Sequence, residues 1–231
     1  MKNNIFRAYD IRGSYPEQLD AQAARLIGKA FASFVIRKYG IEHPRVIVGK
    51  DNRSHGPELQ LAFIEGLLEH GAHVARVEDC PSPMLYHAVC VGGFDAGVNI
   101  TASHNPADYN GFKLVGRQAH SICGEEIQII LKMIQEEDFV PPSEGEVQDI
   151  SIVDSYFQAL TDLVEFRRPL KIVIDAGNGI AGKYYPELFR RLGCEVFELY
   201  CEQDGSFPNH EPDPVVEVNT ADLKAAVLEA R

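Results

Sequence analysis

A serine and a histidine stand side by side, Ser103 and His104, in a polar loop that follows a short apolar run. The run, residues 94–100, has the length and composition of a buried strand. Asn-Pro at 105–106 and Asn-Gly at 110–111 are turn dipeptides, so we expect the chain to double back before it resumes an extended path. The serine hydroxyl is therefore expected just past the end of a strand, where it is sterically open.

A lysine further along the chain can join this pair. In Phe-Lys-Leu at 112–114, the two-residue period of a strand sends Lys113 to the face opposite its apolar neighbours. An ammonium, an imidazole and a hydroxyl could then converge. Such a group suits a phosphorylated serine, because a transferable phosphoryl group needs positive donors and an acid or base to serve the alcohol. The residues around Ser103 do not form the Gly-x-Ser-x-Gly turn of hydrolases, which disfavours acyl transfer.

Each candidate also has a simpler interpretation. Serines in Asn-Pro and Asn-Gly turns commonly bond only their own backbone. His104 could bond a backbone carbonyl, and Lys113 could be a solvated strand residue. The Gly-rich loop at 175–179 could cradle a phosphate, but it lacks the Gly-x-Gly-x-x-Gly pattern. A tight strand-to-helix turn is the simpler interpretation of that loop.

The composition is that of an ordinary globular protein. The 231 residues are 45% hydrophobic and 24% charged, enough for one or two cores, and we expect two domains. A formal net charge of −12 argues against nucleic acid or an anionic membrane surface as the main partner, because the field of the whole chain repels polyphosphates. An anionic small molecule would need local basic residues to overcome this field.

The cysteines and the N-terminal residues indicate the compartment. The five cysteines are odd in number and scattered, and they form no Cys-x-x-Cys, so neither a disulfide framework nor a thiolate metal site is indicated. The N-terminus lacks the apolar core of a signal peptide, and no run approaches the roughly 18 apolar residues of a membrane span. We expect a soluble protein of the reducing cytoplasm.

The elements that must position these residues alternate between helices and strands. The expected helices cover 20–38, 57–70, 124–137, 152–164, 183–192 and 220–231, and the expected strands cover 45–49, 73–77, 94–100, 112–115, 170–175 and 195–199. This alternation predicts an α/β fold of repeated, parallel-rich mixed sheets with helices on both faces. The polar, proline-bearing stretch 139–149 is the expected linker between a first domain, 1–138, and a second domain, 150–231, which we expect to be truncated.

Five separated motifs occur in order along the chain. They are Phe-Arg-Ala-Tyr-Asp-Ile-Arg-Gly at 6–13, Thr-Ala-Ser-His-Asn-Pro at 101–106, Asn-Gly-Phe-Lys at 110–113, Asp-Ala-Gly-Asn-Gly at 175–179 and Asp-Gly-Ser-Phe-Pro-Asn-His at 204–210. Together they resemble the motifs of the phosphohexomutases, and most closely those of the bacterial phosphomannomutase/phosphoglucomutase enzymes. Phosphoglucosamine mutases, which usually open with a Gly-Thr-Asp-Gly type of motif, are the alternative within the superfamily.

The resemblance implies phosphohexomutase domain 1 and most of domain 2. It also implies an intramolecular phosphotransferase that interconverts hexose 1-phosphate and hexose 6-phosphate, of mannose or glucose, through a bisphosphorylated sugar. Ser103 is then the phosphorylated residue, Lys113 the general acid/base, and His104 a helper close to the transferred group. The implied substrate-binding residues are Tyr9, Arg12 and Asn105.

Two arginines keep alternatives open. Arg12 offers a planar fork to phosphate oxygens, but it could instead pair with Asp10 at the surface. Lys-Asp-Asn-Arg at 50–53 resembles a Gly-Arg-Asp-Gly-Arg segment of the family with substitutions at two places. Arg53 is therefore a structural or a cleft residue, and its role stays open.

The resemblance also implies Mg²⁺, with the phosphate on Ser103 as one ligand, and hexose 1,6-bisphosphate as activator and intermediate. The family's metal loop, sugar-recognition loop and C-terminal phosphate-binding domain lie downstream of the last motif found here. We therefore expect an N-terminal portion that is inactive alone and whose partners are the missing C-terminal domains and a phosphosugar. The choice between mannose and glucose depends on that absent half. A non-catalytic fragment or binding module of the same fold is the alternative from another class.

Overall fold

The computed structural model describes residues 3–230, whose contacts divide them into two compact units. The first unit holds the chain up to Asp51 together with His55–Ala102 and Asp108–Ile152. The second unit holds Asn52–Ser54, Ser103–Ala107 and the chain from Val153 onward. Two short loops of the N-terminal half therefore belong, by their contacts, to the second unit.

The first unit is built on a six-stranded sheet in the order β1-β5-β4-β2-β3-β6. Its strands are β1 (Ile11–Ser14), β2 (Arg45–Lys50), β3 (His73–Asp79), β4 (Ala96–Ile100), β5 (Tyr109–Gly116) and β6 (Glu146–Asp149). β2 runs parallel to β3 and β4, and β3 runs parallel to β6. β5 is antiparallel to both of its neighbours, β1 and β4, so a single loop is enough to join β4 to β5.

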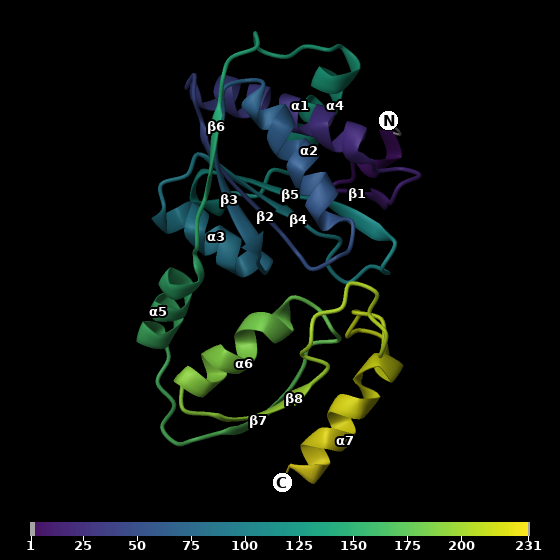
Figure 1. The fold of residues 1–231 in the computed structure, drawn as a ribbon, viewed down its shortest axis with the longest axis vertical. Coiled ribbons are helices and arrows are strands. Elements are labelled where there is room, and N and C mark those ends of the chain that lie inside the picture. Colours follow the sequence, from purple (N-terminus) through teal and green to yellow (C-terminus); the bar gives the residue numbers. More distant parts are fainter. Residues whose placement is uncertain (1–2, 231) are drawn as a thin grey trace. The chain divides into compact units, whose positions relative to one another are not determined.

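Helices cover both faces of this sheet (Figure 1). They are α1 (Ala21–Tyr39), α2 (Gly56–Leu68), α3 (Ser82–Val91) and α4 (Glu125–Gln135), with 3-10 turns at Asn3–Ile5 and Arg117–Ala119. α1, α2 and α4 share one apolar core with alternate strand residues such as Val48 and Phe112. α3 packs on the opposite face, where a Cβ on Gly97 of β4 would lie 2.5 Å from a methyl group of Val89.

Two glycines let α1 and α2 approach closely. A Cβ on Gly28 would lie 2.2 Å from the carbonyl oxygen of Phe63, and a Cβ on Gly66 would lie 2.1 Å from that of Arg25. No side chain fits at such distances, so the two helices touch backbone to backbone. This contact fixes α2, the crossover between β2 and β3, against α1.

The second unit contains the parallel pair β7 (Lys171–Asp175) and β8 (Glu195–Leu199). α6 (Ala181–Arg191) is the crossover and packs on both strands, and α5 (Val153–Leu163) contacts α6. The ring of Phe157 in α5 meets that of Tyr184 in α6 edge to face, with centroids 6.5 Å apart. A 3-10 turn, Glu217–Thr220, leads into α7 (Ala221–Glu229), which contacts β7.

The α/β fold predicted from the alternation of helices and strands is confirmed. The long helix expected at 20–38 is α1, whose first turn is capped by the carboxylate of Asp20, which accepts from the amide of Ala23 at 2.8 Å. It ends at Gly40, whose φ of +65° suits glycine. β1 and α3 have no counterpart among the expected elements.

The turn expected from Asn-Gly at 110–111 is wrong, because Asn110 and Gly111 lie inside β5. A Cβ on Gly111 would lie 2.1 Å from the carbonyl oxygen of Ile11 in β1, so the glycine serves close strand pairing and not chain reversal. The side-chain oxygen of Asn110 accepts from the amide of Gly111 at 2.8 Å.

The stretch 139–149, expected to be a linker, contains β6. This strand pairs with β3 at the edge of the sheet, and all of its residues are exposed. A short, polar edge strand has the same composition as a linker, which explains why the sequence pattern does not separate the two. The position of the domain boundary stays a prediction.

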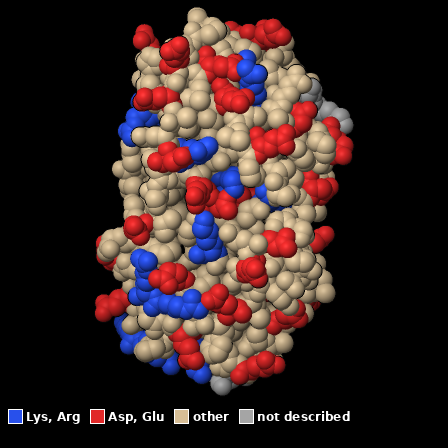
Figure 2. Space-filling view, in the orientation of Figure 1, with Lys and Arg blue, Asp and Glu red and all other residues tan. Residues whose placement is uncertain are grey.

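Neither a membrane-spanning helix nor a patch of a single charge sign is found in the described part of the chain and on the face drawn in Figure 2. Within residues 3–230, the structure contains no helix that is long and apolar enough to cross a membrane. Acidic and basic side chains are intermixed on the face drawn in Figure 2, in a chain whose formal net charge is −12.

Candidate active site

Ser103 lies just beyond β4, in the loop that leads to β5. The residue is exposed, and its φ is +58°, in the left-handed region that residues other than glycine seldom adopt. This conformation costs an L-residue about 1–2 kcal/mol. Such strain persists only where surrounding contacts fix the backbone, and it concentrates at functional sites. The backbone of Ser103 is therefore held in place by its neighbours.

His104 and Asn105 occupy the same loop in the second unit. Nδ1 of His104 lies 3.4 Å from Oγ of Ser103, at the long end of the hydrogen-bond range, and the imidazole is exposed. The backbone carbonyl of Asn105 accepts a hydrogen bond from Arg53. The structure thus brings Ser103 and His104 together, and the main-chain carbonyl of Asn105 is bonded to Arg53.

Lys113 lies in β5 of the first unit, directly opposite Asn99 in β4. Its neighbours in sequence, Phe112 and Leu114, are buried in the large core, whereas Lys113 is half-buried on the face that α3 covers. The side-chain amide nitrogen, Nδ2, of Asn99 donates to the hydroxyl of Ser82, the first residue of α3, at 2.8 Å. The lysine ammonium therefore projects on the side of the sheet predicted from the two-residue period.

Arg12 belongs to the same face as Lys113. It stands in β1 opposite Gly111, and Gly111 and Lys113 share one side of β5, so the two basic residues are diagonal neighbours on adjacent strands. The guanidinium of Arg12 pairs with Asp10, and the arginine side chain is 9% exposed. The ion pair considered as an alternative for Arg12 is thus present, but it lies largely buried and not at the surface. Tyr9 is 81% exposed.

The loop at 175–179 is a tight turn between β7 and α6, as its simpler interpretation predicts. Asn178, whose φ is +59°, organises it and is buried. Its amide donates to the carbonyl of Tyr200 at 2.7 Å, and its side chain donates to that of Glu202 at 2.9 Å. The side-chain oxygen of Asn178 accepts from Asn209 at 2.8 Å. This loop is built to hold neighbouring loops together.

His210 is bonded on both of its ring nitrogens. Nδ1 lies 2.8 Å from the carbonyl oxygen of Glu211, and Nε2 lies 3.1 and 3.2 Å from the two carboxylate oxygens of Asp175. Burial lowers the pKa of His210, but the hydrogen bonds to Glu211 and Asp175 and the negative charge of Asp175 raise it, and the net shift is upward. The protonated imidazole is therefore the form that this contact favours.

Replacing His210 with glutamine is expected to remove a pH-dependent part of the stability. Because the folded-state pKa lies above the unfolded one, the stabilisation is fully present below the unfolded pKa and is lost as the pH rises through the folded pKa. Urea unfolding from about pH 5.5 to about pH 8.5 should give a difference between wild type and variant that shrinks as the pH rises. His120→Gln, at a side chain that is 68% exposed, is the control. A difference that stays constant with pH would contradict the assignment.

Two of the thiols, those of Cys80 and Cys201, are poor candidates for the nucleophile. All five cysteines are free. Burial raises the pKa of Cys80 to about 12, and burial together with the charge of Glu198 raises the pKa of Cys201 to about 11. Both stay protonated near neutral pH, where only a thiolate would be reactive.

The described residues do not by themselves fit a magnesium site. Within residues 3–230, no three His, Cys, Asp or Glu side chains stand close enough together to hold a metal ion. Ser103 would supply an oxygen ligand only after phosphorylation, whereas Mg²⁺ demands near-octahedral oxygen coordination.

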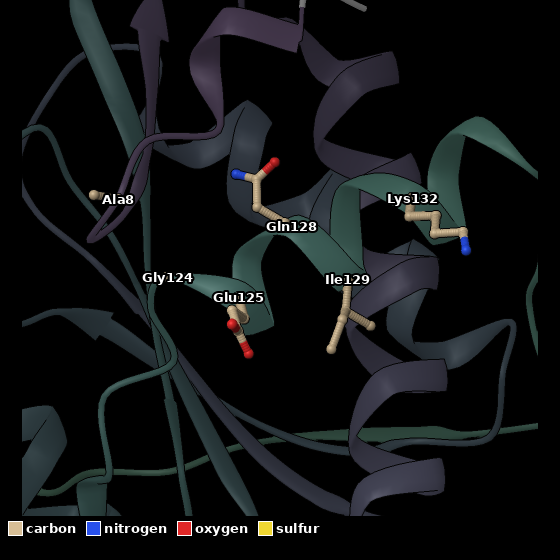
Figure 3. Close-up of a pocket in the computed structure, with 6 residues that line it drawn as sticks. All are labelled: Ala8, Gly124, Glu125, Gln128, Ile129 and Lys132. Carbon is tan, nitrogen blue, oxygen red and sulfur yellow. The ribbon is translucent and has the colours of Figure 1, made fainter.

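A surface hollow of about 490 Å³ lies along the start of α4 in the first unit. Its lining residues are Ala8, Gly124, Glu125, Gln128, Ile129 and Lys132. Figure 3 shows that the polar ends of Glu125 and Gln128 point away from each other. A ligand site needs a few polar groups that converge, so this hollow is not a candidate.

Family models match both parts of the chain. Residues 3–141 match phosphoglucomutase/phosphomannomutase alpha/beta/alpha domain I, and residues 154–230 match alpha/beta/alpha domain II of the same family. The two matches leave the segment between them, which contains β6, unassigned. The first three sequence motifs, at 6–13, 101–106 and 110–113, fall within the match to domain I, and the last two, at 175–179 and 204–210, fall within the match to domain II.

Curated and solved relatives agree with these matches. The chain is 43% identical over 224 residues to the phosphomannomutase/phosphoglucomutase of Pseudomonas aeruginosa, covering 97% of this chain and 47% of the relative. It is 42% identical over 225 residues to the phosphoglucomutase of Neisseria meningitidis serogroup B, covering 97% and 48%. A crystal structure of a phosphoglucomutase/phosphomannomutase family protein from Burkholderia thailandensis superposes with a TM-score of 0.92 at 40% identity, covering 98% of this chain and 50% of that one. The chain spans about half the length of the curated relatives it matches.

Proposed function

The chain belongs to the phosphoglucomutase/phosphomannomutase family, and on that premise we propose that the protein interconverts hexose 1-phosphates and hexose 6-phosphates through a phosphoserine at Ser103. The observation that carries the proposal is the exposed serine fixed at a φ of +58° at the end of β4, within the family's first domain. A nucleophile held rigidly in one position gains much of its rate from positioning alone, which phosphoryl transfer requires above all.

The proposed transfer of the phosphoryl group from Ser103 to the sugar needs no reactant besides the phosphoserine and the sugar phosphate. A hydroxyl oxygen of the sugar phosphate attacks the phosphorus on Ser103, and the bond from phosphorus to Oγ breaks with its electron pair remaining on Oγ. The hydroxyl proton leaves to a base, and Oγ takes up a proton, so the products are a sugar bisphosphate and a free serine. The reverse step, with the other phosphate of the sugar, restores the phosphoserine and completes the exchange between positions 1 and 6.

The predicted residues take the following roles in this proposal. Lys113 is the general acid/base, and the diagonal neighbour Arg12 adds positive charge on the same face of the sheet. His104, within reach of Oγ of Ser103, assists next to the transferred group. Tyr9, which is exposed, and Asn105 bind the substrate.

Mg²⁺ and hexose 1,6-bisphosphate are proposed as cofactor and activator. If Mg²⁺ binds, it would supply positive charge for the transferred phosphoryl group, and the phosphate on Ser103 would be this chain's contribution to its coordination. The bisphosphate loads Ser103 by the reverse step: Oγ attacks one phosphorus of the bisphosphate, the bond from that phosphorus to the sugar oxygen breaks, and a sugar monophosphate is released. We also propose that a phosphosugar and further domains of the same protein are the partners, and that the protein works in the cytoplasm.

Coupled assays of the full-length protein test the proposal. With glucose 1-phosphate or mannose 1-phosphate, Mg²⁺ and the 1,6-bisphosphate, we expect formation of the 6-phosphate at roughly 1–10³ per second, the ordinary range of enzyme turnover. Activity restricted to glucosamine phosphates would assign the protein to the other branch of the superfamily. No turnover with any of the three sugars would overturn the proposal.

A further inference from the structure

Arg53 is the most deeply placed cation next to the Ser103 loop, with 1% of its surface exposed. Its Nη2 donates to the backbone carbonyl of Ser103 at 3.2 Å and to that of Asn105 at 2.7 Å. Its Nη1 donates to the carbonyl of Pro106 at 2.5 Å. One guanidinium therefore spans three carbonyls of a single loop, with the added strength of a charged donor.

The face of the same guanidinium is covered by an aromatic ring. Cζ of Arg53 lies 5.0 Å from the ring centroid of Phe207, within the range of a cation–π contact. Phe207 has a φ of +52°, and its amide donates to the carbonyl of Asp204 at 3.0 Å. The N–H groups at the edge of the guanidinium thus bind the Ser103 loop, and its flat face packs on Phe207 in the motif at 204–210. A lysine ammonium cannot make both contacts.

The residue before Arg53 is anchored as well. The side chain of Asn52 donates to the carbonyl of Asn178 at 2.8 Å. A Cβ on Gly205 would lie 2.6 Å from the carbonyl oxygen of Asn52 and 2.9 Å from the amide nitrogen of Ser54, so the two backbones are in contact there. Arg53 therefore extends from a fixed main chain, and it can transmit that fixed position to the carbonyls that it binds.

We infer that Arg53 is a positioning residue that holds Ser103 in its left-handed conformation. This inference rests on the proposed function of Ser103. The bond to the Ser103 carbonyl fixes the peptide that follows the serine, and the bonds to Asn105 and Pro106 fix the return of the loop. Without them, Ser103 relaxes towards the ordinary regions of φ, and its hydroxyl moves off the line of attack on phosphorus.

Two variants of the full-length protein test this role. Arg53→Met keeps the length of the side chain but removes its donors, and Arg53→Lys keeps the charge without the fork. We expect kcat to fall by about 10²-fold in the first and by less in the second, with KM for the sugar phosphate changed less than about threefold. The matched control is Gln60→Met, because Gln60 is also buried and donates to two carbonyls, those of Val48 and Val77. The control should unfold at a lower temperature while its kcat stays unchanged.

Two further measurements separate the possible failures. Peptide mass spectrometry after treatment with glucose 1,6-bisphosphate reports phosphate on Ser103, and a wild-type protein without it would refute the proposed function itself. If wild type is phosphorylated but Arg53→Met keeps kcat within about twofold, the positioning role is overturned. Amide hydrogen exchange at Ser103, His104, Asn105 and Ala107 in Arg53→Lys gives a reading independent of turnover, and it decides the matter if Arg53→Met does not fold. Exchange there should be at least about tenfold faster than in wild type, and unchanged exchange would overturn the role.

Discussion

Replacement of Ser103 with alanine in the full-length protein is expected to reduce the interconversion of hexose phosphates by about 10⁴-fold or more. In the proposed function the hydroxyl oxygen of Ser103 is the atom that carries the phosphoryl group. The hydroxyl of Thr101, at the start of the same loop, is buried and donates to the carboxylate of Asp51 at 2.6 Å. The measurement is turnover in a coupled assay, with intact-mass spectrometry to follow phosphate on the protein.

The left-handed backbone at Ser103 supplies an unusual control. Alanine at a φ of +58° keeps the strain of the wild type, whereas glycine relieves it at a gain of about 1 kcal/mol. Ser103→Gly should therefore be as inactive as Ser103→Ala, while its thermal stability should equal or exceed that of the alanine variant. This combination separates loss of the hydroxyl from loss of the fold.

Two results would contradict the assignment of Ser103. One is turnover by Ser103→Ala within about tenfold of wild type. The other is phosphate found on a different residue after treatment with the 1,6-bisphosphate, with Ser103 unmodified. Either result would return Ser103 to the simpler interpretation of a turn serine that bonds only to backbone.

The parts of the fold that could be predicted are those with a long local signal. α1 carries a capping aspartate at its start, an apolar stripe and a glycine after its last turn, and its bounds agree with the expected helix to within a residue. β1 has only four residues, and one of them is Gly13, so neither its length nor its composition distinguishes it from a loop. Its strand character depends on pairing with β5, which no local pattern contains.

Asn110–Gly111 shows how tertiary packing overrides a local preference. The dipeptide is typical of turns because glycine and asparagine tolerate positive φ. In this protein the same absence of a Cβ is used for another purpose, the close approach of β1 to β5. Sequence alone cannot distinguish the two uses of glycine, because the atom that a Cβ would meet, the carbonyl oxygen of Ile11, is distant along the chain.

The candidate site divides in the same way. Ser103 and His104 could be predicted because a single contiguous motif places them in one loop. The contacts of Arg53 could not, because its acceptors are backbone carbonyls 50 to 53 positions away, and a carbonyl has no signature in the sequence. The sequence indicated Arg53 only by its place in the segment 50–53, which follows the expected strand at 45–49 and matches the family's Gly-Arg-Asp-Gly-Arg pattern with two substitutions.

Lys113→Met is the second change with a large expected effect. Methionine keeps the length of the side chain and removes the ammonium, so a general acid/base role predicts that kcat falls by about 10²–10⁴-fold while the fold is unaffected. Lys113 is only half-buried, and β5 is paired with a strand on each side, β1 and β4, so we expect the strand to keep its place when the ammonium is removed. Turnover and thermal unfolding are measured together, and Lys132→Met, at a lysine side chain that is 69% exposed in α4, is the control that should change neither.

Lys113→Arg then separates proton transfer from simple electrostatics. Arginine keeps the positive charge, but its pKa is too high for it to give up a proton near neutral pH. If Lys113 moves a proton, the arginine variant should be nearly as slow as the methionine variant. If the residue only stabilises charge on the phosphoryl group, arginine should recover most of the rate. A loss of less than about tenfold in Lys113→Met at unchanged thermal stability would instead leave Lys113 as a solvated strand residue, and the acid/base of the reaction would have to be sought elsewhere.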